Sequence, residues 1–80
     1  MDIERARKQM ADHIDGQAKY QGQIVQVRFL REDGATGEQV FELKKGAKTA
    51  EMRLPKEDLA LRPQRIMAID EQIAGALEKL

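Results

Sequence analysis

The chain has 80 residues, enough for one small domain over residues 1–80 but too few for a large buried core. Its 14 basic and 14 acidic residues balance, which argues against a protein that coats nucleic acid, because such proteins carry a large positive excess. The absence of cysteine excludes disulfides and thiolate metal sites, and it fits a cytoplasmic protein.

Residues 2–15 have the pattern of an amphipathic helix. Asp2 can cap its N-terminus by accepting a hydrogen bond from a free backbone N–H. Apolar side chains then recur on one helical face, at Ile3, Ala6, Met10 and Ile14. The Asp15-Gly16 pair predicts the end of this helix, because glycine readily takes the left-handed conformation found at helix C-termini. We interpret His13 as a solvated side chain of the last turn.

Residues 22–31 switch to the two-residue period of a β-strand. One face carries three apolar residues that we assign to the core: Val25, Val27 and Phe29. The opposite face is apolar at its ends and polar in the middle, with Ile24, Gln26, Arg28 and Leu30. The loop that follows, residues 32–37, contains Asp-Gly as its strongest turn signal.

Two further strands are predicted at residues 38–44 and 48–54. Pro55 ends the second of them, because proline has no N–H to donate to a neighbouring strand. The inward-facing residues of the two strands are Phe41, Leu43, Ala50, Met52 and Leu54.

The register of this hairpin has two alternatives. A four-residue loop over residues 45–48 pairs Leu43 with Ala50, but it leaves Glu42 and Glu51 face to face on the outer surface. A two-residue turn would instead place a lysine opposite Leu43. We favour the four-residue loop, because apolar matching gains more than a solvated like-charge pair costs.

Residues 56–59 are predicted to form a short helical turn, and Pro63 to start a last helix. Its apolar stripe contains Ile66, Ile69, Ile73, Leu77 and Leu80. Gly75 weakens this helix unless another backbone packs close to it. The order α-β-β-β-α predicts an α+β fold, an antiparallel three-stranded sheet packed against two helices. The alternative is a small SH3-like barrel in which residues 59–62 form an extra strand and the last helix is an appendage.

Reactive side chains are scarce. Ser, Cys, Asn and Trp are absent, and His13 is the only histidine. A catalytic triad cannot be assembled, and a zinc site would need ligands from several chains or mostly carboxylates. We therefore expect no enzyme activity, no metal or cofactor, and no small-molecule substrate. No segment approaches the roughly 20 apolar residues of a membrane span, so we expect no membrane partner.

Four basic residues lie in or near the hairpin tip: Lys44, Lys45, Lys48 and Arg53. They could contact nucleic acid, or the lysines could simply keep an exposed turn soluble. The expected element order is similar to that of double-stranded RNA-binding domains, which read duplex shape, and the likeness is one of topology. Those domains carry a basic cluster at the start of the last helix, where this chain reads Arg62-Pro63-Gln64-Arg65.

The mixed face of residues 23–30 indicates self-association. In a simple meander this strand lies at a sheet edge, whereas the other edge is expected to be short and to end at Pro55. We expect a non-catalytic adaptor that acts through protein–protein contact, as a homodimer joined by this edge or by the helix at residues 66–80. The predicted interface contains Ile24, Gln26, Arg28, Leu30, Ile73 and Leu77. Alternatively, Ile24 and Leu30 only touch the terminal helices, and a weak nucleic-acid-binding module is the alternative function.

Overall fold

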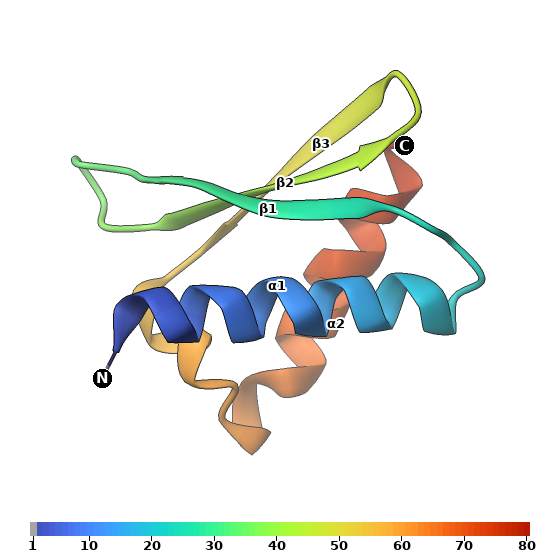
Figure 1. The fold of residues 1–80 in the computed structure, drawn as a ribbon. Helices are drawn as coiled ribbons and strands as arrows, with labels where there is room; N and C mark the ends of the chain where they lie inside the picture. Colours follow the sequence, from blue (N-terminus) through green and yellow to red (C-terminus); the bar gives the residue numbers. More distant parts are fainter. Residues whose placement is uncertain (1) are drawn as a thin grey trace.

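A three-stranded antiparallel sheet forms one layer of the protein (Figure 1). The computed structural model describes residues 2–80. The strands are β1 (Gln26–Glu32), β2 (Gln39–Lys45) and β3 (Lys48–Leu54), and they lie in the order β1-β2-β3. The sheet is therefore an open meander in which β1 and β3 each have one edge without a partner strand.

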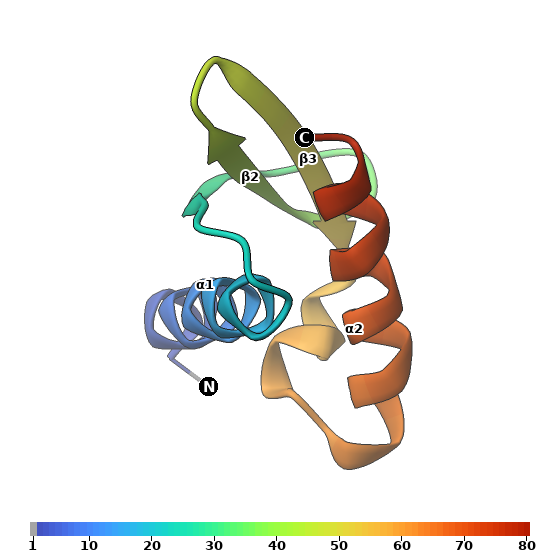
Figure 2. The same cartoon turned by 90° about the vertical axis from the view of Figure 1, so that its right-hand side faces the viewer.

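Two helices form the second layer, α1 (Ile3–Tyr20) and α2 (Pro63–Glu78). Both lie on the same side of the sheet, and they cross: Figure 2 looks along α1 while α2 is seen from its side. A 3-10 helix, η1 (Lys56–Ala60), connects β3 to α2. This arrangement confirms the predicted α+β fold. The barrel alternative is not needed, because residues 59–62 lie in η1 and in the connection after it rather than in a strand.

Helix α1 begins as predicted, since the Asp2 carboxylate accepts a hydrogen bond from the Arg5 backbone N–H at 3.2 Å. The predicted end at residues 15–16 is wrong. The helix runs on to Tyr20 because Ala18 continues the buried stripe by one more turn. Gly22 ends it instead, with a φ of 76° and a hydrogen bond from its N–H to the Lys19 carbonyl at 2.9 Å.

The hairpin of β2 and β3 has the favoured register. Leu43 lies opposite Ala50, and Glu42 lies opposite Glu51. Strand β2 ends one residue later than expected, at Lys45, whereas β3 has the predicted bounds. Lys45 and Lys48, the two ends of the expected four-residue loop, therefore form a pair, and only two residues remain in the turn. Gly46 supplies the positive φ, 61°, that such a turn requires.

Two arginines of β1 relieve the repulsion between Glu42 and Glu51. The Arg28 Nε lies 3.0 Å from a Glu42 carboxylate oxygen, and an Arg31 guanidinium nitrogen lies 3.7 Å from Glu51. The outer face of the sheet, which the helices leave uncovered, is thus a set of cross-strand ion pairs.

Strand β1 starts later than predicted, at Gln26, although Val25 before it is buried. Its register against β2 shifts between Phe29 and Arg31, so Leu30 lies in a β-bulge. The expectation that the other edge is short is wrong. Strand β3 has seven residues, the same number as β1.

The core fills the space between the sheet and the helices. Its largest fully buried side chains come from every element except β1: they include Phe41 from β2, Leu54 from β3, Met10 from α1, Ile69 from α2 and Leu59 from η1. Among residues 2–80, every buried side-chain nitrogen or oxygen atom has a hydrogen-bond partner. The helices cover the inner face over β2 and β3, whereas Val27 and Phe29 on the inner face of β1 stay partly exposed. The surfaces that can contact other molecules are therefore the two sheet edges, the outer face and the hairpin.

Candidate functional site

The only histidine links the two helices. His13 Nε2 lies 2.8 Å from the Asp70 Oδ1 of α2, and both side chains are half-buried. The interpretation of His13 as a solvated residue of a last turn is therefore wrong, because α1 continues past it and α2 packs beside it. No group of three potential metal-ligating side chains occurs within residues 2–80.

Two further polar clusters connect elements of the fold. The Asp58 carboxylate of η1 is only 4% exposed and accepts two hydrogen bonds from Arg65 of α2, at 3.0 and 3.1 Å. These bonds raise the pKa of Arg65. Near the start of α1, Arg7 donates to the buried Gln39 at 2.8 Å, and Gln39 in turn donates to Glu32 at 2.8 Å. All of these groups are paired within the monomer, so they hold elements together.

The lysines of the hairpin are exposed, and within residues 2–80 they form no ion pair. Lys45 and Lys48 lie directly opposite each other and therefore share a face of the ribbon. Lys44 lies opposite Thr49, on the other face. The hairpin thus carries three free positive charges that point to two sides.

Arg53 is not part of this group. It lies toward the other end of β3, where its Nη1 is 2.7 Å from the Asp33 Oδ2 and 3.9 Å from Glu38. The hydrogen bond from Arg53 lowers the pKa of the Asp33 carboxyl, and the backbone N–H of Ala35 adds to this effect. Arg53 forms ion pairs with two acids and is separated from the hairpin tip by most of β3, so its charge does not add to that of the three lysines.

Four of the predicted interface residues lie in β1 or in the connection that leads into it. Ile24, which leads into the strand, is 83% exposed. Gln26 and Arg28 are exposed, although Arg28 is engaged by Glu42, and Leu30 is half-buried in the bulge. Ile24 therefore does not pack under a terminal helix.

The two other predicted interface residues lie in the core. Ile73 is fully buried and Leu77 is 2% exposed, because α2 turns its apolar stripe toward the sheet and α1. Neither side chain offers surface to another chain in this fold. Of the six predicted interface residues, only the four at the β1 edge are therefore available for contact with another chain.

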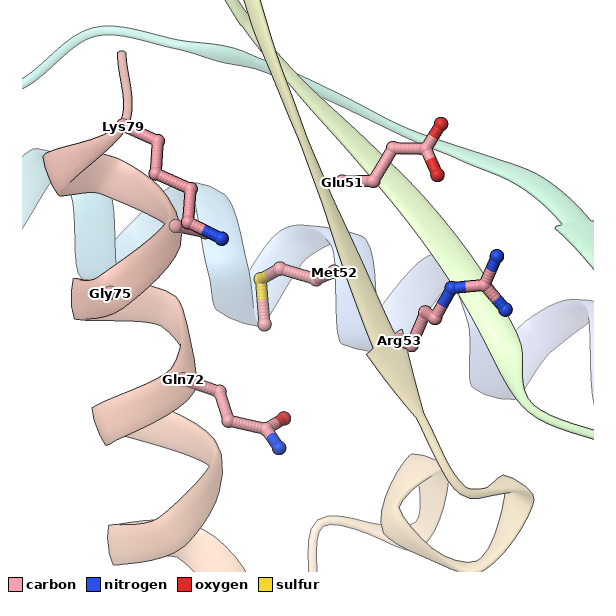
Figure 3. Close-up of a pocket in the computed structure, with 7 residues that line it drawn as sticks. Glu51, Met52, Arg53, Gln72, Gly75 and Lys79 are labelled. Atoms are coloured by element: carbon pink, nitrogen blue, oxygen red, sulfur yellow. The ribbon is translucent and has the colours of Figure 1, made fainter.

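A groove between the free edge of β3 and helix α2 was not predicted (Figure 3). Its volume is about 240 Å³, and it is lined by Glu51, Met52, Arg53, Gln72, Gly75, Ala76 and Lys79. The sequence pattern could not reveal it, because it depends on where α2 lies beside the sheet. The one signal in the sequence was Gly75, a glycine inside a helix.

Comparison with protein-family models, with curated proteins and with solved structures gives no match for this chain. Within residues 2–80, neither helix combines the length and the apolar character needed to cross a membrane.

Proposed function

We propose that this protein is a non-catalytic protein-binding module that works as a homodimer joined along the free edge of β1. The observation that carries the proposal is the exposure of Ile24, at 83%, beside a strand whose outer edge pairs with no other strand of residues 2–80. Tyr20, at the other end of the same connection, is 88% exposed. Exposed apolar side chains next to an open strand edge favour pairing with another chain.

Antiparallel pairing of β1 with its copy is self-complementary about a two-fold axis. An axis through Val27 lies close to the middle of residues 26–29, the part of β1 before the bulge. It sets Ile24 of one protomer opposite the partner's Leu30. It also sets Gln26 opposite the partner's Arg28, so apolar residues meet apolar ones and polar residues meet polar ones. The two sheets would then join into one.

The test is the mass of the protein in sedimentation equilibrium at micromolar concentration. We expect the wild-type chain to have twice the 9.1 kDa of one protomer. Ile24→Lys should give a monomer, because the substitution brings two positive charges into the joined edge. Met67→Lys is the matched control, since Met67 is also highly exposed, at 77%, but lies in α2.

A wild-type protein that sediments as a monomer throughout the micromolar range would overturn the homodimer. A dimer that persists in Ile24→Lys but dissociates in Met67→Lys would show that the interface lies on α2 instead. Circular dichroism of both variants checks that the fold is intact, which we expect because neither side chain contributes to the core.

Nucleic-acid binding is the second candidate function. The observation that favours it is the set of three exposed lysines at the hairpin, Lys44, Lys45 and Lys48, none of which forms an ion pair within residues 2–80. Three phosphate contacts on a duplex would give a plot of log affinity against log salt with a slope of about −3.

Fluorescence anisotropy with a labelled RNA duplex and a labelled DNA duplex, from low to moderate salt, measures this slope. The triple substitution of these lysines by Gln should abolish the binding, whereas Lys56→Gln, an exposed lysine of η1, should not change it. No binding at low salt would remove this candidate and leave the homodimer.

A further inference from the structure

The groove between β3 and α2 places a strand edge beside a helix with open space between them. Within residues 2–80, β3 pairs with β2 on one side only, so the backbone groups on its other side have no partner strand. In Figure 3, Met52 points from β3 toward α2, while Gln72 and Lys79 extend from α2 at the two ends of the groove.

Gly75 lies between Gln72 and Lys79 on the helix wall. A glycine inside a helix is less stable than an alanine at the same position. Nothing within the monomer requires it, because its φ is not positive and a Cβ atom would meet nothing within 4 Å. Because glycine has no side chain, the helix backbone is open to the groove at this position. A second backbone could therefore approach it closely. Gly16 of α1 has the same open surroundings but does not line this groove.

The charges of the groove are asymmetric. Glu51 is engaged by Arg31, and Arg53 by Asp33 and Glu38. Lys79 forms no ion pair within residues 2–80. The end of α2 that carries Lys79 lies toward the hairpin end of β3 (Figures 1 and 2), and Lys48, also unpaired, begins the strand there. Free positive charge is therefore concentrated at the hairpin end.

We propose that this groove binds the extended C-terminal tail of a partner protein, which adds to β3 as a fourth, antiparallel strand. Strand addition satisfies the free backbone groups of β3. A chain antiparallel to β3 ends at the hairpin end, so its terminal carboxylate meets Lys79 and Lys48. A parallel chain would instead place its N-terminal side among the same positive charges. A small or apolar side chain of the tail lies between Met52 and Gly75.

The probe is a phage-displayed library of random peptides with free C-termini, selected on the whole protein. The most enriched peptide is then synthesised as the free acid, as the C-terminal amide and with alternate backbone nitrogens methylated, and affinity is measured by fluorescence anisotropy. We expect the amide to bind at least tenfold more weakly. Methylation of the nitrogens that face β3 should abolish binding, because those N–H groups form the strand pairing.

Matched glycine variants locate the site. Gly75→Leu should abolish binding by filling the groove, whereas Gly16→Leu makes the same change in an open helix position and should bind as the wild type does. Lys79→Gln should weaken binding about tenfold without filling any space, and it keeps the proposal testable if Gly75→Leu folds poorly. Chemical shift changes in an NMR titration should be confined to β3 and α2.

Three results would overturn the proposal: no enriched peptide, equal affinity of the acid and the amide, or wild-type affinity in Gly75→Leu. The proposal is independent of the homodimer, since β3 and β1 are opposite edges of the sheet. The Ile24→Lys variant, expected to be a monomer, should therefore bind the peptide with unchanged affinity. A failure of the homodimer proposal can thus be distinguished from a failure of the peptide-binding proposal.

Discussion

Asp58 shows how much a buried charge depends on one partner. In the sequence it is an acid near the start of a short helical turn, where it could be solvated and interact with the helix dipole. In the fold it is almost fully buried and binds Arg65 through two hydrogen bonds. The pair joins η1 to the first turn of α2.

We expect Arg65→Met to destabilise the protein by about 1–3 kcal/mol, because it leaves the buried Asp58 carboxylate without its donor. The measurement is the free energy of unfolding from urea denaturation. Arg62→Met is the control, since Arg62 is exposed and has no ion-pair partner within residues 2–80. If Arg65→Met and Arg62→Met lost equal stability, the ion pair would contribute nothing. The double variant with Asp58→Leu should recover part of the loss.

The predicted site residues differ in whether the local sequence pattern could predict their exposure and their partners. Ile24 is identified by its position on a mixed strand face, and the structure leaves it exposed. Ile73 is also an apolar residue of a predicted element, the last helix. Its exposure, however, depends on which face of α2 turns toward the core. Arg53 belongs to a basic stretch in the sequence, yet its partner Asp33 lies 20 residues away. Local pattern cannot assign such distant partners.

Among the elements, α1 shows how tertiary contact overrides a local stop signal. Asp15-Gly16 is a strong C-terminal signal, but the helix continues because burial of Ala18 adds one turn of packing. Termination then occurs at Gly22, where the Gln23 N–H donates to the Ala18 carbonyl at 2.8 Å and completes the capping motif.

Alanine substitution distinguishes the two glycines. Gly16→Ala should stabilise the protein by about 0.5–1 kcal/mol, because it replaces glycine inside a helix where the added Cβ meets nothing. Gly22→Ala should destabilise it by about 1 kcal/mol, because the native φ of 76° is unfavourable for alanine. Thermal unfolding of both variants gives the signs. The opposite pair of signs would place the helix end at Gly16.

The hairpin of β2 and β3 shows the reverse case, in which local pattern was sufficient. Side chains alternate between faces in a strand, so only registers of one parity bury both apolar sets. Matching Leu43 with Ala50 then selects one of them, and the structure has that register. The like-charge pair Glu42 and Glu51 is relieved by arginines from β1, a contribution that the hairpin sequence does not contain.

The molecule as a whole has two helices on one face of a sheet with two free edges. Three strands are too few to close into a barrel, so both edges stay open. Each edge has a different neighbour: β1 begins beside the exposed connection from α1, whereas β3 lies beside α2. This asymmetry is why we propose a second copy at one edge and an extended tail at the other.

If the homodimer is the native state, its stability depends on protein concentration. We expect the wild-type melting temperature to rise by a few degrees for each tenfold increase in concentration, because every tenfold step favours the associated state by about 1.4 kcal/mol. The melting temperature of Ile24→Lys should not change with concentration. Differential scanning calorimetry over a wide concentration range measures both. A wild-type melting temperature that stays constant would contradict dimerisation.

Periodicity in the sequence was enough for the order of elements, for the inward faces of the strands and for the hairpin register. Each of these depends on residues close to one another in the chain. The long-range pairings came only from folding, as in His13 with Asp70, 57 residues apart. The same holds for the depth at which Ile73 lies and for the groove at Gly75, because both follow from how α2 packs against the sheet. That packing is set by the summed contacts of the whole core, and no short stretch of sequence contains it.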